Sequence, residues 1–398
     1  MTSFAEPSFS ARHAAITLAL CALVAAFEGA DLQAAGVVMP HIAPLFHFVV
    51  SEKKWFLAAG TIGLVIGALI GGRIADLWGR KVALMISVAV FGVCSVATAL
   101  AATKSGLIEA RLATGIGLGG ALPNLIALTA EATRALHRRR AVAVMYCGMP
   151  FGGGCISLLS LAGATGGSWQ DVFYVGGLAP VALLPLLWFW LPDSAEFQAA
   201  KLGSARPPVL ASLFGAGLAV RTLLLWTSFF TGLLVLYLLL NWLPSLMVAR
   251  GLSEADAAWI QVAFNLAAAA GALAAGAALG RAATLAVLLF FGGAIAGVAL
   301  LALVPATLFA ELIASSVVGA AVVGAQSILL ALAPGFYPTT VRGTGVGSAV
   351  SAGRLGSVAG PLVAGLILQG GGNAVSVLFY LIPVAAVSMA AATMLIRK

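Results

Sequence analysis

Two carboxylates stand three positions apart in "AAFEGADLQAAGVV", a stretch whose other residues suit a lipid environment. Glu28 and Asp31 therefore share one face of a helix. A charged aspartate or arginine at mid-membrane costs about 2.5–3.5 kcal/mol before its partners are counted. Because ionisable residues in such segments mark ion or substrate pathways, the pair predicts proton transfer within a membrane.

Arg111 lies in an equally apolar stretch. Arg111 and Asp31 each stand about six or seven residues from the same side of the membrane, roughly 10 Å deep at 1.5 Å per residue. Equal depth allows an ion pair between them if the two helices are neighbours. In such a pair, burial favours the neutral carboxyl while the nearby guanidinium favours the charged one. Proton coupling by Asp31, Glu28 and Arg111 is one interpretation, and a static salt bridge that fixes helix packing is the other. For Glu28, a proton relay and simple hydrogen bonding to neighbouring helices stay equally open.

Arg354 lies near the middle of another apolar run. The first half has no acid at the equivalent position and no membrane-embedded acid of the second half lies near it in sequence, so we expect it to be unpaired. A guanidinium that faces a water-filled cavity suits bidentate binding of a carboxylate. A role in helix packing or in snorkelling to the lipid surface is the alternative. Further polar residues could complete a substrate site with apolar walls, although each could instead satisfy a neighbouring helix. These candidates are Asn124, Tyr146, Tyr237, Asn241 and Gln326.

The composition defines the class of protein that carries these groups. Hydrophobic residues make up 62% of the 398 positions and charged residues 9%, whereas soluble chains are about a quarter charged. Apolar runs of about twenty residues recur from end to end, so we expect an all-α polytopic protein in a lipid bilayer. In "GTIGLVIGALIGG", glycines four apart predict a close helix–helix contact. We place twelve spans at about 14–38, 55–75, 82–102, 105–129, 141–164, 171–191, 221–245, 256–279, 284–304, 308–333, 341–369 and 374–396.

Several function classes are disfavoured. The net charge of +8 comes from basic residues spread over short loops, which argues against nucleic-acid binding. The four cysteines show no paired spacing, and no metal-ligand cluster, nucleophile–base set or phosphate loop is visible. We therefore expect no metal, no cofactor and no enzyme. We place His13, His41, His47 and His137 in loops, so carboxylates would have to carry any protons.

The chain divides into two similar halves. A weakly apolar interval predicts a six-helix bundle over 1–191, a cytoplasmic loop over 192–220 and a second bundle over 221–398. "GGALPNLIAL" in the first half resembles "VGAQSILLAL" in the second, as in transporters built from repeated halves. Lysine and arginine gather on one side of the predicted spans, which predicts a bacterial inner-membrane protein with both termini in the cytoplasm.

The loop "GGRIADLWGRK" at 71–81 resembles the signature of the major facilitator superfamily. "EGAD", "ARLATGIGLGGALPN" and "YPTTVRGTGVGSAVSAGRLGSVAGP" resemble the aromatic acid:proton symporters of that superfamily. "EGADLQAAG", "ALPNLIALTAEA", "MYCGMP", "NWLP" and "LALAPGFYP" resemble their 3-(3-hydroxyphenyl)propionate transporter branch. The resemblance runs nearly end to end and implies the superfamily's fold of twelve helices in two six-helix halves.

The resemblance also implies a function and a gate. It implies import of a small aromatic or arylalkanoic monocarboxylate with protons by alternating access, with Arg354 associated with transport. It implies a cytoplasmic gate formed by Asp76, Arg80 and Arg342. Two features depart from the family's pattern: the acidic pair often begins with aspartate where this chain has Glu28, and "GAALGRAATL" lacks the acid of the signature loop.

Other transport modes stay open. The substrate could be another organic anion, such as a nicotinate-like or aliphatic acid. Drug–proton exchange ranks lower, because "CGMPFGGG" only partly resembles the motif of exchangers in the superfamily. A sodium site could replace the proton site, because carboxylates and unwound carbonyls also bind sodium. We expect the chain to work as a monomer.

Overall fold

The computed structural model describes residues 11–134, 138–164, 168–191, 213–215, 217–279, 282–338 and 341–397. In this part of the chain, 12 helical segments are long and apolar enough to cross a membrane. They match the predicted spans in number and order, and the described residues form no strand. The structure therefore confirms an all-α polytopic fold.

The first half contains six spans. Its helices are α1 (Ala11–Leu45), α2 (Val50–Trp78), α3 (Arg80–Leu100), α4 (Lys104–Ala132), α5 (Arg138–Tyr146), α6 (Gly148–Ala164) and α7 (Gln170–Trp190). The fifth span consists of two helices, α5 and α6, that meet at Cys147. Pro150 accounts for the break, because a proline has no N–H to donate to the carbonyl four residues earlier, here that of Tyr146.

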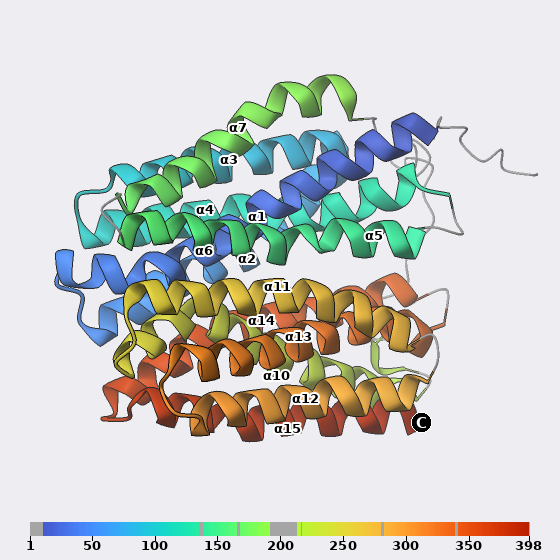
Figure 1. Ribbon diagram of the computed structural model, residues 1–398. Helices are drawn as coiled ribbons and strands as arrows, with labels where there is room; N and C mark the ends of the chain where they lie inside the picture. The colour runs from blue at the N-terminus through green and yellow to red at the C-terminus, as the bar shows by residue number, and fades with distance from the viewer. Residues whose placement is uncertain are drawn as a thin grey trace, which may run out of the picture.

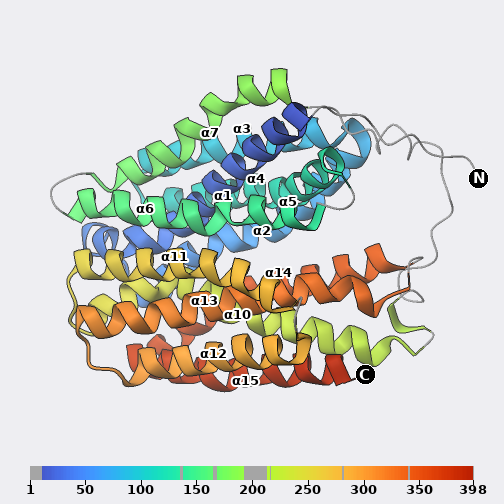
Figure 2. The ribbon, with the colours of Figure 1, turned by 45° about the vertical axis from the view of Figure 1, so that its right-hand side comes forward.

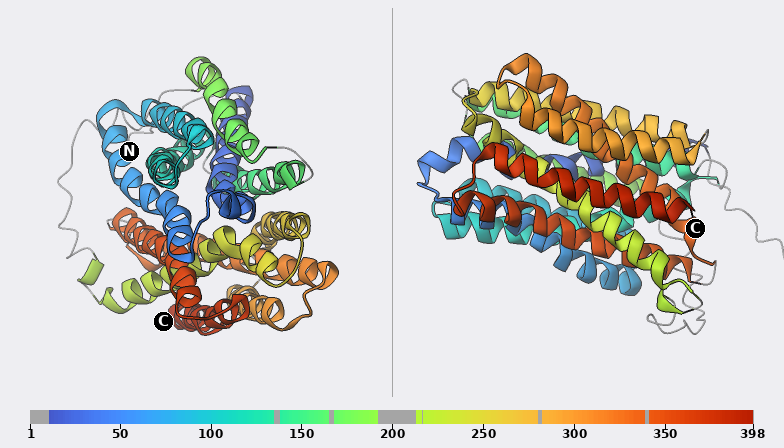
Figure 3. Two further views of the ribbon diagram at one scale, coloured as in Figure 1. Left: turned by 90° about the vertical axis from the view of Figure 1, so that its left-hand side faces the viewer. Right: turned by 90° about the horizontal axis from the view of Figure 1, so that it is seen from below.

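The second half repeats this arrangement. Its helices are α10 (Ala219–Ala249), α11 (Glu254–Leu279), α12 (Ala283–Leu303), α13 (Leu308–Leu332), the 3-10 helix η1 (Ala333–Phe336), α14 (Arg342–Gln369) and α15 (Ala374–Arg397). Figures 1 and 2 show α1–α7 as one bundle above α10–α15. The left view of Figure 3, which looks down the helix axes, shows the two bundles next to each other. Most of the predicted loop at 192–220 lies outside the described residues, so these domain boundaries stay a prediction.

Both chain ends lie at one end of the helix bundles. Figure 1 shows α1 beginning and α15 ending on the right, which we call the terminal end. The opposite end, where α1 leads into α2, is called the far end below. Arg12 and Arg397 both lie at the terminal end, as the predicted arrangement of cytoplasmic termini requires.

Glycines let α2 and α4 touch backbone to backbone. A Cβ atom at Gly63 would overlap the carbonyl oxygen of Leu112, and one at Gly67 would overlap that of Ile116. The contact is reciprocal, because a Cβ at Gly119 on α4 would overlap the carbonyl oxygen of Leu64. The close approach predicted from the spacing of small residues is therefore present.

Candidate functional site

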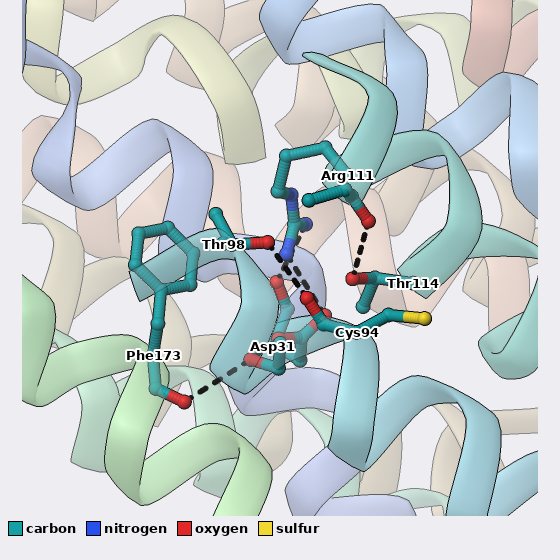
Figure 4. A network of polar contacts seen from close by, with 8 residues as sticks. Asp31, Cys94, Thr98, Arg111, Thr114 and Phe173 are labelled. Carbon is teal, nitrogen blue, oxygen red and sulfur yellow. Dashed lines mark hydrogen bonds and ion pairs between the residues drawn. The ribbon is translucent and has the colours of Figure 1, made fainter. Parts of the chain in front are cut away.

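Asp31 and Arg111 form a buried ion pair inside the first half (Figure 4). Arg111 Nη1 lies 3.0 Å from Asp31 Oδ2, and Nη2 donates to the main-chain oxygen of Asp31 at 2.9 Å. Ser95 Oγ on α3 donates to the second carboxylate oxygen at 2.7 Å. Asp31 and Arg111 are 0% and 1% exposed. The predicted pair is present, with both carboxylate oxygens engaged.

The pair also organises its surroundings. The single hydroxyl hydrogen of Ser95 has a second, more distant acceptor in the carbonyl oxygen of Phe173 on α7, 3.2 Å from Ser95 Oγ. The Phe173 ring centroid lies 5.7 Å from the Arg111 guanidinium carbon. This network joins α1, α3, α4 and α7. Sequence reasoning missed Ser95, because one serine in an apolar helix carries no distinguishing signal. Whether Asp31 takes part in proton coupling stays a prediction.

A central cavity lies between the two halves. Helices α1, α4, α5 and α6 line it from the first half, and α10, α11, α13 and α14 line it from the second. The space inside it that is open to water-sized molecules is about 120 Å³. Its wall is mostly leucine, valine, phenylalanine and other apolar side chains. The polar wall residues are Gln33, Tyr146, Tyr237, Asn265, Gln326 and Arg354.

Arg354 places a permanent positive charge on this apolar wall. It is 9% exposed, and its Nη1 donates to the Tyr237 hydroxyl at 3.0 Å. Tyr146 and Glu28 are its other electrostatic neighbours. No ion pair of Arg354 is seen among the described residues, and its expected role stays a prediction. Glu28 of the first half is nevertheless an electrostatic neighbour, which the sequence did not indicate. The two residues are far apart in sequence, and only the packing of α1 against the second half brings them together.

Glu28 differs from Asp31 in its hydrogen bonding. It is 0% exposed, and neither carboxylate oxygen has a hydrogen-bond partner among the described residues. A buried ionised carboxylate without hydrogen bonds is costly. The expected bonds from neighbouring hydroxyl or backbone groups are not seen in the described chain, and the charge that Glu28 interacts with is that of Arg354.

Two predicted substrate residues lie off the cavity wall. Asn124 donates its side-chain amide to the carbonyl oxygen of Gly120 at 2.7 Å, and Asn241 donates to that of Tyr237 at 2.8 Å. Each amide thus bonds the preceding turn of its own helix, and neither residue lines the cavity. The structure places Tyr146, Tyr237, Gln326 and Arg354 on the wall, whereas their roles in binding stay predictions.

A cluster of amide side chains joins the two halves at the cavity wall. Gln33 Nε2 on α1 donates to Asn265 Oδ1 on α11 at 2.9 Å. In return, Gln33 Oε1 accepts from Asn265 Nδ2 at 2.7 Å and from Gln261 Nε2 at 3.1 Å. We call these three residues the amide clasp. All are buried, and sequence reasoning missed them because nothing in the sequence pairs residues of different halves.

Two further polar contacts join the halves at the far end. Lys54 Nζ on α2 donates to Gln369 Oε1 on α14 at 2.8 Å. His41 Nδ1 on α1 lies 3.4 Å from a carboxylate oxygen of Glu254 on α11. Among the described residues, these two contacts and the clasp join the halves by hydrogen bonds and an ion pair. Two of the three connections thus lie at the far end, and the clasp lies deeper, on the cavity wall.

The predicted gate residues lie at the terminal end. The side chains of Asp76 and Arg342 are outside the described residues. Arg80 forms an ion pair with Glu131 in the last turn of α4, a partner that sequence reasoning missed. The gating role stays a prediction.

The histidine placement needs correction. His13 and His41 lie within α1 rather than in loops, because α1 extends beyond the predicted span at both ends. His47 lies in the turn after α1, as expected, and His137 is outside the described residues. The described histidines still lie near helix ends, away from the Asp31–Arg111 pair.

The chain belongs to the Major Facilitator Superfamily, whose sequence model matches residues 21–361. The relatives it matches are transporters, which confirms the expectation of a transporter rather than an enzyme. It is 46% identical over 374 residues to the 3-(3-hydroxy-phenyl)propionate transporter of Escherichia coli K12, covering 94% of this chain and 91% of that one. It is 35% identical to the gallate transporter of Pseudomonas putida, with coverages of 89% and 85%. It is 33% identical to the 4-hydroxybenzoate transporter PcaK of Pseudomonas aeruginosa, with coverages of 94% and 90%.

Solved structures support the fold. The xylose transporter XylE from E. coli in a partially occluded inward-open conformation matches with a TM-score of 0.76 at 15% identity, covering 97% of this chain and 98% of that chain. A bacterial homologue of the human lysosomal transporter Spinster, inward-facing and unoccupied, matches with a TM-score of 0.73 at 18% identity, covering 98% and 99%. The predicted fold of two six-helix halves is that of these transporters.

The buried ion pair gives a stability prediction. Asp31→Asn leaves the Arg111 guanidinium buried beside a neutral amide, so we expect a loss of about 3–5 kcal/mol. The loss appears as a lower unfolding temperature of the detergent-solubilised protein. The double variant Asp31→Asn/Arg111→Gln removes the uncompensated charge and should recover part of the loss. A single variant as stable as the wild type would show that the pair does not hold the four helices together.

Proposed function

We propose that the protein is a secondary active transporter that imports a small aromatic or arylalkanoic monocarboxylate, of the 3-(3-hydroxyphenyl)propionate kind, together with protons. The observation that carries this proposal is Arg354, a permanent positive charge on the wall of an apolar cavity between the two halves. Apolar walls suit an aromatic ring, and a guanidinium binds a carboxylate through paired hydrogen bonds. The cited relatives are named for 3-(3-hydroxyphenyl)propionate, gallate and 4-hydroxybenzoate, which are aromatic carboxylates.

Glu28 is the group that we assign to the proton. In the empty cavity it supplies negative charge near Arg354. A proton bound to Glu28 removes that charge, and the substrate carboxylate then takes its place as counter-ion of Arg354. One proton and one anion thus occupy the site together without adding net charge. Asp31 is already bonded to Arg111 and Ser95, so we assign it to holding α1 in position.

Movement of the two halves exposes the site to each side in turn. We assign the terminal end to the cytoplasm, because lysine and arginine are more frequent there, and the protein to the bacterial inner membrane, where it works as a monomer. The contacts at the far end then close the periplasmic side. Outward opening requires the amide clasp, the Lys54–Gln369 bond and the His41–Glu254 contact to break.

Carboxylate recognition can be tested by uptake into proteoliposomes. Radiolabelled 3-(3-hydroxyphenyl)propionate should accumulate when the external medium is acidic relative to the lumen. Arg354→Lys should raise the half-saturation concentration by about tenfold or more, since lysine lacks the planar fork of the guanidinium. Arg73→Lys, at an exposed site on α2, should transport as the wild type does. Unchanged affinity in Arg354→Lys across several aromatic acids would remove Arg354 from the site.

Proton coupling is tested at Glu28. Glu28→Gln imitates the protonated acid permanently, so binding and exchange of labelled for unlabelled substrate should persist. Accumulation driven by the pH gradient should be lost, because the variant cannot release a proton. Both activities are measured in the same vesicles. Two results would contradict the assignment. One is substrate accumulation by the wild type that follows a sodium gradient, and the other is accumulation by Glu28→Gln that still follows the pH gradient.

The amide clasp can be tested by distance measurement. Spin labels at Ala102→Cys and Ala306→Cys, exposed sites on opposite halves at the far end, report opening of that end in a cysteine-free background. Gln33→Leu removes the clasp hydrogen bonds and should add a longer-distance population. Ser157→Ala, which removes a hydroxyl bonded within its own helix, should leave the distribution unchanged. An unchanged distribution in Gln33→Leu would mean that the clasp does not hold the far end closed.

A further inference from the structure

We propose that Gln326 selects substrates that carry a ring hydroxyl by accepting the hydrogen bond of that hydroxyl. The inference rests on the proposed function and specifies its substrate class. Gln326 lies on α13, is 4% exposed and lines the central cavity. Its Oε1 has no hydrogen-bond partner among the described residues. A buried acceptor without a partner on a cavity wall is a place where a ligand donor gains a bond that the protein does not supply.

The other polar groups of the wall belong to the amide clasp or lie near Arg354. Gln33 and Asn265 bond to each other in the amide clasp. Tyr237 accepts from Arg354, and Tyr146 is an electrostatic neighbour of the same guanidinium, so both belong to the carboxylate end of the site. A ring hydroxyl bound away from that end meets mainly apolar side chains and the Gln326 amide.

The side-chain amide of Gln326 packs against α10. Its nitrogen lies against Gly232 on α10, where a Cβ atom would overlap it. Gly232 therefore provides the space in which the side chain rests. Counting from the far end at 1.5 Å per residue, Arg354 lies roughly 22 Å along α14 and Gln326 roughly 27 Å along α13. Gln326 is thus about one helical turn closer to the terminal end than the guanidinium is.

These positions define a pose for the substrate. The carboxylate binds at Arg354, and the ring extends between apolar side chains toward the terminal end, where its hydroxyl meets Gln326. A hydroxyl buried without a partner loses its hydrogen bonds to water and gains none in return. A site that offers an acceptor also disfavours the analogue that lacks the hydroxyl, since its own polar group then stays unpaired. We therefore expect arylalkanoic acids with a ring hydroxyl to bind better than unsubstituted ones.

The test compares two acids that differ only in the hydroxyl. Half-saturation concentrations are measured in proteoliposomes for 3-(3-hydroxyphenyl)propionate and for 3-phenylpropionate. The wild type should favour the hydroxylated acid by about tenfold, the value of one hydrogen bond. Gln326→Leu and Gln326→Met should bring the ratio near one by weakening the hydroxylated acid alone. Uptake of 3-phenylpropionate in the same vesicles shows that each variant folds and transports.

Asn241→Leu is the matched control, because it removes a buried amide that bonds its own helix and lies off the cavity wall. It should keep the wild-type ratio. A tenfold preference that survives in both Gln326 variants, or a wild type that treats the two acids alike, overturns the inference while leaving aromatic-acid transport intact. A wild type that takes up neither acid overturns the proposed function itself.

Discussion

Buried charge is the constraint on which this structure depends, because an ion in a low-dielectric interior must have a partner. The protein meets the constraint in two ways. Asp31 and Arg111 are paired inside one half, with Ser95 completing the hydrogen bonds. Glu28 and Arg354 are electrostatic neighbours that belong to different halves, and Glu28 accepts no hydrogen bond from the described residues. The first pair keeps its geometry when the halves move, whereas the second depends on how the halves are placed.

Helix α1 brings these functions together. Within two turns it carries Glu28 toward Arg354, Asp31 toward the interior of its own bundle, and Gln33 toward α11. The three side chains differ in direction because successive residues are turned by about 100° along a helix. Fixing Asp31 to Arg111 therefore also fixes the side of α1 that meets the second half. Charge pairing, cavity lining and closure of the far end thus share one rigid element.

Much of this could be predicted from the sequence. Apolar run lengths define the spans. Equal depth in two runs pairs Asp31 with Arg111 once the family resemblance makes the first and fourth helices neighbours. The approach of Glu28 to Arg354 and of Gln33 to Asn265 could not be predicted, because it depends on how two separately folded bundles meet. Asn124 and Asn241 lie off the cavity wall, because a polar side chain in an apolar helix can donate its hydrogen bond to a carbonyl oxygen of the preceding turn. Periodicity cannot distinguish that bond from a bond to a ligand.

The glycine contact between α2 and α4 has a mechanical consequence. With no side chains between the two backbones, there is little compressible material to absorb a displacement. Helices α2 and α4 are therefore expected to move together as one rigid body. When a rigid bundle tilts about an axis near its middle, the two halves separate at one end of the helices and approach each other at the other end. Such rigidity would help to keep the cavity from opening to both sides of the membrane at once, in addition to the contacts between the halves at the far end.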